Sequence, residues 1–330
     1  MAHPIATAPV TDAVVADVIR AVTAATGRPA YPDARWRPPV QGAVGHLLGL
    51  RLAGRTDADD ADLLVAKLFP PAVSARAATE ATALTAAAVL GDEVPRAVVA
   101  GRLAGGTGFL VMTRLPGDRW ADVRPALSPA DAAAVVAQVG SVAGRLHAVT
   151  GEHFGALADD GDGGPTPRRW ATSRGWTTAL VERTLAAFDA AGGDPVLATG
   201  VERLAAASLL DDAVPPSLCH QDLNGGNILL RRDPGSVPVI SGLVDFERAE
   251  WADPAHDLAL TVVHLMHEGE ADLVPVLLDA HGGMDPAARS RLALHVVLRM
   301  TAEWAWVATD RPADWRHKTV TLAGWIRART

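Results

Sequence analysis

Residues 219–227 read C-H-Q-D-L-N-G-G-N, and residues 244–246 read V-D-F. The first stretch contains the pattern H-x-D-x-x-x-x-N, which fixes Asp222 and Asn227, and the second stretch supplies Asp245. An Asp that polarises an attacking hydroxyl, together with an Asn and a second Asp that hold Mg²⁺, can transfer a phosphoryl group from a nucleotide to that hydroxyl. The two stretches therefore predict a site of phosphoryl transfer.

The segment between these two motifs has the pattern of a β-hairpin. Residues 228–232 and 237–244 are β-prone, and residues 233–236 read D-P-G-S, which is a turn signal. A hairpin with its turn near the midpoint brings Asn227 and Asp245 side by side, as two ligands of one metal ion require. Mg²⁺ prefers hard oxygen ligands, usually one or two carboxylates with phosphates and water. The sequence therefore predicts a Mg²⁺ site formed by Asn227 and Asp245.

An apolar strand with a single charge is predicted far upstream. Residues 63–69 read L-L-V-A-K-L-F, and alternation along a strand places Lys67 on the same face as Val65 and Phe69. Of the 30 basic residues only two are Lys, namely Lys67 and Lys318, and the others are Arg. A compact ammonium and a planar guanidinium are not interchangeable at a phosphate site, so the use of Lys here favours a phosphate-binding role. The alternative is a solvated charge on an edge strand.

A helix with a central carboxylate follows this strand. Residues 72–90 are Ala-rich and predict a helix that Gly91 stops, and Glu80 lies in its middle. A strand Lys that contacts nucleotide phosphates, held in place by a Glu on the next helix, is the arrangement found in kinases. The H-x-D pattern alone occurs by chance in many chains. The presence of Lys67 and Glu80 upstream adds weight to the interpretation as a phosphoryl-transfer site.

With these motifs, the chain resembles the aminoglycoside phosphotransferases and related antibiotic and small-molecule kinases, from about residue 40 to about residue 265. The chain departs from the pattern at Gln221, where the family usually has Gly, and at Glu247, where protein kinases have the Gly of D-F-G. Where this chain has Gln221, protein kinases have Arg. The absence of Arg here implies an enzyme without a regulatory activation loop. Further segments that fit the family are residues 109–117 (the strand into the interlobe hinge), 144–155 (L-H-x … F-G) and 253–259 (D-P-x-x-D-L-A).

The resemblance implies an α+β, protein-kinase-like fold with two lobes. Residues 1–112 would form an N-terminal nucleotide-binding lobe, with an antiparallel sheet plus a helix. Residues 113–116 would form the hinge, whose backbone meets the purine. Residues 117–330 would form a mostly helical C-terminal lobe for catalysis and substrate binding.

The resemblance also implies roles for individual residues. Asp222 would be the catalytic base or hydroxyl-orienting group, and Asn227 and Asp245 would hold Mg²⁺. His220 and Asp257 would brace the catalytic loop, which is the H-x-D-x-x-x-x-N stretch of residues 220–227. The predicted residues for binding the cofactor, ATP or GTP, are Lys67, Glu80, Gly42, Gly45, Met112 and Thr113.

The C-terminal helices of this family build the acceptor pocket, as the resemblance implies. Carboxylates there suit an amino-substituted antibiotic, and Trp suits a sugar face, a cation or an aromatic ring. The leading hypothesis is an O-phosphotransferase that modifies an aminoglycoside-like, nucleoside or peptide antibiotic and gives resistance. The alternatives are a metabolic kinase for an amino alcohol, sugar or ketosamine, and a catalytically dead nucleotide-binding module. The predicted acceptor-binding residues are Glu268, Glu270, Glu303 and Trp304.

Composition excludes several other classes of protein. The net charge of −8 and the pI near 5.7 argue against nucleic acid as the main partner. The N-terminus lacks a signal-peptide pattern, and no uncharged apolar run is long enough to span a membrane. A single cysteine, Cys219, excludes an intramolecular disulfide and is expected to be a buried thiol. We expect a cytoplasmic protein, monomeric or homodimeric, that acts on a small molecule.

Overall fold

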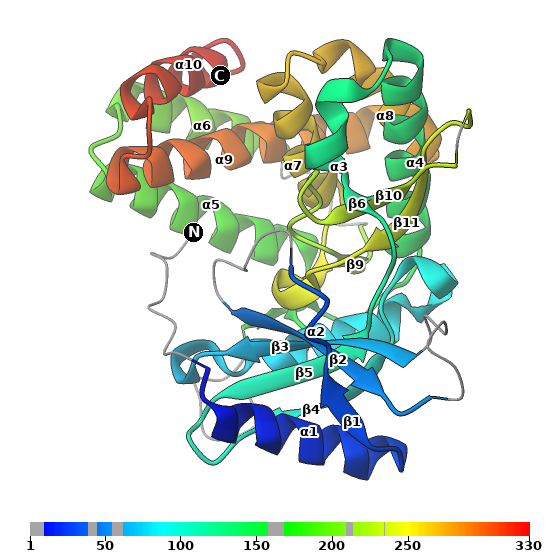
Figure 1. Cartoon of the computed structure of the whole chain (residues 1–330). Helices are drawn as coiled ribbons and strands as arrows, with labels where there is room; N and C mark the ends of the chain where they lie inside the picture. The colour runs from blue at the N-terminus through cyan, green and yellow to red at the C-terminus, as the bar shows by residue number, and fades with distance from the viewer. Residues whose placement is uncertain (1–9, 39–44, 55–61, 158–167, 209–213, 234) are drawn as a thin grey trace.

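The computed structural model describes residues 10–38, 45–54, 62–157, 168–208, 214–233 and 235–330. An antiparallel sheet with two helices forms one end of the molecule, and a larger group of helices forms the other end (Figure 1). This arrangement confirms the predicted α+β, kinase-like fold. No helix in the described ranges is long and apolar enough to cross a membrane.

The N-terminal sheet places Lys67 on an interior strand. Its order is β1-β2-β3-β5-β4, and every neighbouring pair is antiparallel. Because β3 pairs with β2 on one side and β5 on the other, Lys67 is not an edge-strand charge. The strands are β1 (Ala30–Pro32), β2 (His46–Leu52), β3 (Leu63–Phe69), β4 (Ala97–Arg102) and β5 (Gly108–Thr113).

The two faces of β3 pack against different helices. Leu64 and Ala66 join one apolar cluster with Val18 of α1 (Asp12–Thr26). Val65, on the opposite face, joins the main core cluster together with Leu84 of α2 (Arg76–Ala86). Lys67 shares this second face, as alternation along the strand predicts. The charge therefore points toward α2 and the rest of the molecule.

The helix predicted over residues 72–90 is shorter than expected. A 3₁₀ turn at Pro71–Val73 comes first, α2 covers only Arg76–Ala86, and Ala87–Glu93 continues as a 3₁₀ segment. A Cβ at Gly108 of β5 would lie 2.4 Å from the carbonyl oxygen of Ser74, so the chain crosses the sheet closely here. Ser74 lies between the 3₁₀ turn at Pro71–Val73 and the start of α2. Glu80 lies within α2.

The predicted hairpin is confirmed. β10 (Ile228–Arg231) pairs with β11 (Val239–Leu243), and Ser236 N donates to Asp233 O at 3.0 Å in the turn. The short β6 (Asp118–Arg119) adds to the other edge of β10. A small second sheet of order β8-β7-β12-β9 consists of β7 (Phe154–Ala156), β8 (Arg169–Trp170), β9 (Ser217–Cys219) and β12 (Glu250–Ala252).

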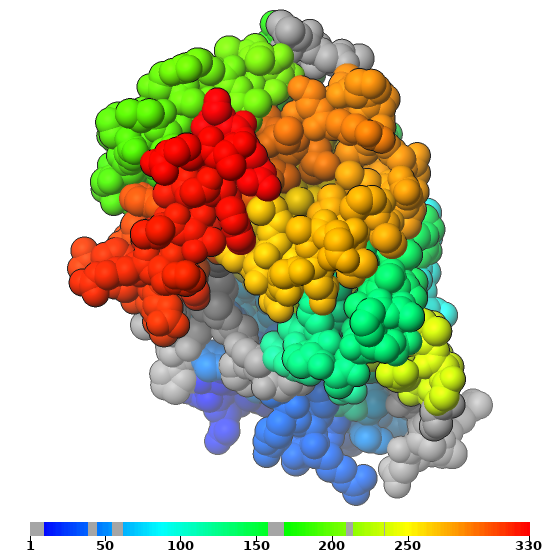
Figure 2. Space-filling model, turned by 90° about the horizontal axis from the view of Figure 1, so that it is seen from above, coloured from blue at the N-terminus to red at the C-terminus, as the bar shows by residue number. Residues whose placement is uncertain are grey.

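Helices from distant parts of the sequence pack around these strands. The longest helix, α9, contacts α5, α6, α7 and α10, whereas α4 packs against α8. A Cβ at Gly140 of α4 would lie 2.3 Å from Leu277 O of α8, so only Gly permits this approach. Figure 2 shows the green, gold, orange and red segments meeting at this end of the molecule. The helices are α3 (Trp120–Val123), α4 (Pro129–His147), α5 (Ser173–Ala190), α6 (Pro195–Ser208), α7 (Pro254–His267), α8 (Val274–His281), α9 (Pro286–Asp310) and α10 (Trp315–Arg327).

The predicted domain boundary falls where β5 ends, at Thr113. The proposed hinge segment is tied to the hairpin, because Ser241 Oγ donates to Pro116 O at 2.6 Å. The division into two lobes at residues 113–116 stays a prediction.

Candidate active site

The ends of the β10–β11 hairpin bring the two predicted metal ligands together. Val244 N donates to Asn227 O at 3.0 Å, which fixes the residues that flank the strands. Asn227 Nδ2 donates to Asp222 O at 2.9 Å. The Oδ1 atom of Asn227 is therefore the atom that could bind a metal ion. Asp245 has a left-handed backbone, with φ of 71°. These positions fit the predicted ligand set for Mg²⁺.

Lys67 lies at the centre of a buried cluster of carboxylates. Its Nζ is 2.9 Å from Glu80 Oε2 and 3.0 Å from Glu247 Oε2, and it also contacts Asp245 Oδ1. Burial opposes the charge on Lys67, but attraction to Glu80, Asp245 and Glu247 outweighs burial and raises its pKa. Burial of Asp245 would raise its pKa, but attraction to Lys67 and their hydrogen bond lower it. Lys67 and Asp245 are therefore both charged at neutral pH.

Glu247 is a member of this cluster that sequence analysis treated only as a departure from a pattern. It lies in a 3₁₀ turn two residues after Asp245, and its Oε1 accepts from Arg76 Nη1 at 2.5 Å. An acid so close to a predicted metal ligand is the signal that could have identified it.

The cluster has more carboxylates than cations. The ligand oxygens of Glu80, Asp245 and Glu247 lie within 4.8 Å of one another, and among the described residues only Lys67 and Arg76 form ion pairs with them. Burial raises the pKa of Glu80 to about 7, against the opposing attraction of Lys67. The close grouping of carboxylate oxygens suits a divalent cation.

A cavity of about 340 Å³ opens in front of this cluster. Met112 and Thr113 line it, as predicted for purine contacts, and Lys67, Asn227 and Asp245 lie on its wall. Apolar side chains supply much of the remaining surface, which suits a planar base. The other apolar residues on its wall include Trp36, Leu47, Val65, Leu229 and Val244.

One of the two predicted phosphate-turn glycines can be placed. A Cβ at Gly45 would lie 2.6 Å from Leu68 O and 3.7 Å from Lys67 Cγ, so Gly45 passes directly over the Lys-bearing strand. Gly42 lies outside the described residues. The roles of both glycines stay predictions.

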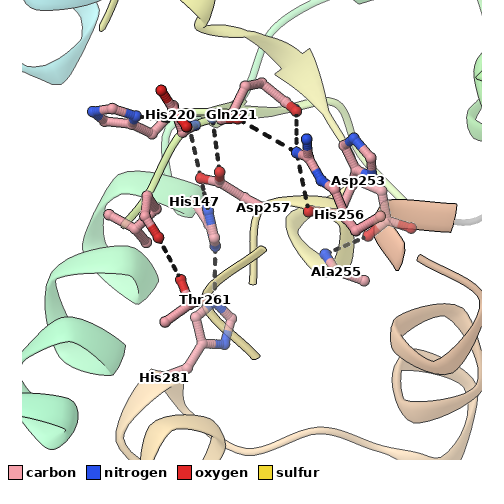
Figure 3. Close-up of polar contacts among 12 residues, drawn as sticks. His147, His220, Gln221, Asp253, Ala255, His256, Asp257, Thr261 and His281 are labelled. Atoms are coloured by element: carbon pink, nitrogen blue, oxygen red, sulfur yellow. Dashed lines mark hydrogen bonds and ion pairs between the residues drawn. The ribbon is translucent and has the colours of Figure 1, made fainter. Parts of the chain in front are cut away.

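The catalytic loop is held from below by one buried carboxylate (Figure 3). Asp257 accepts hydrogen bonds from His220 N at 2.8 Å, Gln221 N at 2.7 Å and His147 Nε2 at 3.1 Å. Burial would raise the pKa of Asp257, but the hydrogen bond from His147 and the nearby imidazoles lower it. His220 Nε2 in turn donates to Val244 O at 3.0 Å. This geometry supports the bracing roles predicted for His220 and Asp257.

The predicted catalytic Asp222 is oriented by a neighbour that sequence analysis did not identify. Asn224 Nδ2 donates to Asp222 Oδ1 at 2.9 Å, and Asn224 Oδ1 accepts from Gly226 N at 2.8 Å. The Asn224 amide is thus fixed at both ends and holds the carboxylate in one position. An Asn before two glycines looks like an ordinary turn residue, which concealed this role.

A second cavity, of about 720 Å³, lies beside the catalytic loop. Gln221, the residue before Asp222, is on its wall. One face of α5 and one face of α9 form most of the rest, with residues spaced at three and four positions. Among these are Leu180, Arg183, Thr184 and Ala187 of α5, and Leu298, Arg299, Ala302, Trp306 and Thr309 of α9.

The structure places none of the four predicted acceptor-binding side chains on the wall of this cavity. Glu270 forms an ion pair with Arg124, and Glu303 accepts from His267 Nε2 at 3.0 Å. Trp304 packs against Phe188, with ring centroids 4.6 Å apart, and Glu268 is exposed at the end of α7. The roles of these four residues in acceptor binding stay predictions. Trp306, two residues beyond Trp304, lies on the cavity wall instead.

The comparison with protein families identifies the class of enzyme as a phosphotransferase. Residues 55–295 match the model of the phosphotransferase enzyme family, and the chain belongs to this family. Among curated proteins, no sequence match was found.

Solved structures with the same fold include aminoglycoside phosphotransferases and a choline/ethanolamine kinase family protein. An aminoglycoside phosphotransferase APH(4)-Ia mutant, in complex with AMP-PNP and hygromycin B, is 15% identical with a TM-score of 0.63, covering 95% of this chain and 97% of that one. The GDP and kanamycin complex of APH(2″)-IIIa is 14% identical with a TM-score of 0.58, covering 95% and 99%. A choline/ethanolamine kinase family protein from Mesorhizobium loti is 19% identical with a TM-score of 0.53, covering 96% and 94%. At these identities the similarity shows the fold alone.

Proposed function

We propose that the protein transfers the γ-phosphoryl group of ATP or GTP, bound with Mg²⁺, to a hydroxyl group of a small molecule. One observation carries this proposal. The hairpin ends, the Lys67–Glu80 pair and the catalytic loop meet between a cavity suited to a nucleotide base and a second, larger cavity. Asp222 follows directly after a residue that lines the larger cavity, which is where an acceptor hydroxyl would bind.

In this reaction Asp222 accepts the proton of the acceptor hydroxyl, whose oxygen forms a bond to the γ-phosphorus. The bond from the γ-phosphorus to the bridging oxygen breaks, and its electron pair leaves with the nucleoside diphosphate. Lys67 binds phosphate oxygens. Mg²⁺, held by Asn227 and Asp245, would supply charge neutralisation when bound. Because the chain does no covalent chemistry, positioning and electrostatic stabilisation dominate.

The nature of the acceptor is the finer part of the proposal. Two of the similar structures contain hygromycin B or kanamycin, which supports an antibiotic acceptor and a role in resistance. The third belongs to a choline/ethanolamine kinase family, which supports the metabolic alternative. The wall of the larger cavity has Glu247, Glu250 and Asp310 as its only carboxylates among the described residues, alongside four arginines. This wall does not favour an acceptor with many amino groups.

The proposal predicts that Asp222→Asn abolishes turnover but leaves nucleotide binding nearly unchanged. General-base and orienting effects are worth roughly 10²–10⁴-fold in rate. We would screen the wild-type protein for hydroxyl-dependent consumption of ATP and GTP, with one panel of antibiotics and one of hydroxyl-bearing metabolites. The kcat of Asp222→Asn would then be measured on any substrate that is found.

A matched control is Asp279→Asn, which changes an exposed carboxylate on α8. This variant should keep wild-type kcat. Activity of Asp222→Asn within about threefold of wild type would contradict the assignment of Asp222. Robust turnover of a primary metabolite without turnover of any antibiotic would establish the metabolic alternative.

A further inference from the structure

We infer that the larger cavity binds an acceptor that carries an oxyanion, either a carboxylate or a phosphate group, through Arg183, Arg248 and Arg299. This inference rests on the proposed function for the hydroxyl that is phosphorylated, and it names the class of molecule that bears this hydroxyl. Three lines of structural observation support it.

The first is that the three guanidinium groups come from three separate elements to one wall. Arg183 lies on α5, Arg299 lies on α9, and Arg248 lies in the 3₁₀ turn that follows Asp245. Packing of α5 against α9 brings the first two together, although 116 positions separate them in the sequence (299 − 183). Arginine presents a planar fork of donors that matches carboxylate and phosphate geometry. Three such forks around one cavity suit an anionic group.

The second is that none of these three arginines forms an ion pair with another described residue. Arg76, the fourth arginine on this wall, is paired with Glu247. Within the described part of the chain, neither Arg183 nor Arg248 forms an ion pair or a hydrogen bond. Burial raises the pKa of Glu250 to about 7, although attraction to Arg183 and Arg299 opposes this shift. Glu250 is therefore a weak counter-charge at neutral pH.

The third is that two hydrogen-bond donors in this wall are buried without an acceptor among the described residues. Arg299 Nη2 donates to Gln221 Oε1 at 2.8 Å, but Arg299 Nε and Gln221 Nε2 are buried without a partner. Unpaired buried donors cost free energy. An incoming group with several acceptor oxygens would therefore be stabilised near them.

A cationic acceptor would need a different wall. The carboxylates predicted for this purpose, Glu270 and Glu303, are already paired with Arg124 and His267. Arg183 and Arg248 would repel ammonium groups that entered the cavity. The same wall also carries Trp306 and Leu298, which can pack against the apolar part of an acceptor.

The test measures oxyanion binding with the nucleotide site already filled. The full chain is saturated with AMP-PNP and Mg²⁺, and inorganic phosphate or acetate is titrated by calorimetry. The variant is Arg183→Gln combined with Arg248→Gln. The matched control is Arg203→Gln, which changes an exposed arginine on α6 away from the cavity. Thermal unfolding and AMP-PNP affinity of each variant verify that it is folded.

We expect phosphate or acetate to bind the wild type, and the double variant to bind at least about tenfold more weakly, which is about 1.4 kcal/mol. The Arg203→Gln control should bind as the wild type does, and raised salt should weaken binding. Weakening for phosphate alone identifies a phosphorylated acceptor, and weakening for acetate alone identifies a carboxylate. No binding of either anion, or equal binding in all proteins, overturns the inference.

The outcome is separable from that of the proposed function. Failure of AMP-PNP to bind, or absence of any hydroxyl-dependent turnover, contradicts the kinase proposal, while the anion titration without nucleotide still reports on the arginines. Conversely, turnover of kanamycin with an unchanged KM in the double variant overturns the inference and leaves the kinase proposal intact.

Discussion

Gln221 and Asp245 both have left-handed backbones, with φ of 66° and 71°. This region is unfavourable for residues with a Cβ, and strained backbone of this kind clusters at functional sites. Gln221 stands where the resemblance to the aminoglycoside phosphotransferases implies Gly. Gly adopts this conformation at no steric cost. The side-chain oxygen of Gln221 accepts a hydrogen bond from Arg299, which offsets part of the strain.

Comparing Gln221→Gly with Gln221→Ala isolates the backbone strain at this position. Both variants remove the hydrogen bond to Arg299, so they differ in backbone freedom. We expect the Gly variant to have a free energy of unfolding about 1 kcal/mol higher than the Ala variant. Urea unfolding measures this difference.

A control at Ala78, an exposed position inside α2, should show the opposite order. There Ala78→Gly should lower stability by about 1 kcal/mol, because Gly disfavours a helix. A Gln221→Ala protein as stable as Gln221→Gly would show that position 221 is not strained.

Among the elements, the β10–β11 hairpin has the clearest chemical consequence. Its turn and strands bring Asn227 next to Asp245 at the open end, where Lys67 from β3 meets Asp245. The nucleotide-side cluster thus depends on contacts between the sheet and the hairpin. A metal ion bound there would replace Lys67 as the main neighbour of Asp245.

For the metal, Asp245→Ala should remove the Mg²⁺ dependence of nucleotide binding, whereas Asn227→Ala should reduce it less, because a neutral amide is the weaker ligand. We expect the affinity for AMP-PNP with Mg²⁺ to fall at least about tenfold in Asp245→Ala. The same titration in EDTA is the internal control, and there Asp245→Ala should bind no worse than wild type. Mg²⁺-stimulated binding that is unchanged in both variants would reject the metal site.

At the scale of the whole molecule, Asp257 joins three parts of the helical region. It lies on α7, binds two backbone amides of the catalytic loop and accepts from His147 at the end of α4. His147 is also 2.9 Å from His281 of α8. Because the carboxylate is fully buried, these contacts keep it ionised, and its removal affects all three elements together.

This network predicts a specific dependence of stability on pH. The pKa of Asp257 is lower in the folded protein than the ordinary value of about 3.9, so its contribution is complete above that pH and is lost as pH falls through the lower folded value. Asp257→Asn should lower the free energy of unfolding at pH 7 by roughly 3 kcal/mol, since hydrogen bonds to a charged group are lost. Urea unfolding between pH 7 and pH 2 measures both quantities.

The variant should also lose less stability than wild type below about pH 4, because it no longer takes up that proton. Asp279→Asn, which changes an exposed carboxylate on α8, should leave the stability at pH 7 unchanged. Equal slopes in wild type and Asp257→Asn would show that Asp257 does not have a lowered pKa.

Local patterns in the sequence were sufficient for the nucleotide side of the site. The strand with Lys67, the helix with Glu80 and the hairpin from Asn227 to Asp245 each depend on alternation, turn residues or Ala content within a short segment. The structure brings these segments together as expected. The predicted end points of the Glu80 helix were wrong, because 3₁₀ segments replace its first and last turns. At the start of the helix, the chain passes close to β5 at Ser74.

The acceptor side was decided by tertiary structure. Which face of α9 lines the cavity depends on its packing against α5 and α7, and both Trp304 and Trp306 look equally suitable in the sequence. The convergence of Arg183, Arg248 and Arg299 likewise depends on helix packing between distant segments. The sequence by itself determined the family and the fold class, and it predicted which segments with Lys67, Glu80, Asn227 and Asp245 come together, because short-range patterns encode them. The tertiary structure alone decided the charge around the larger cavity, because that charge is set by which long-range partners neutralise which side chains.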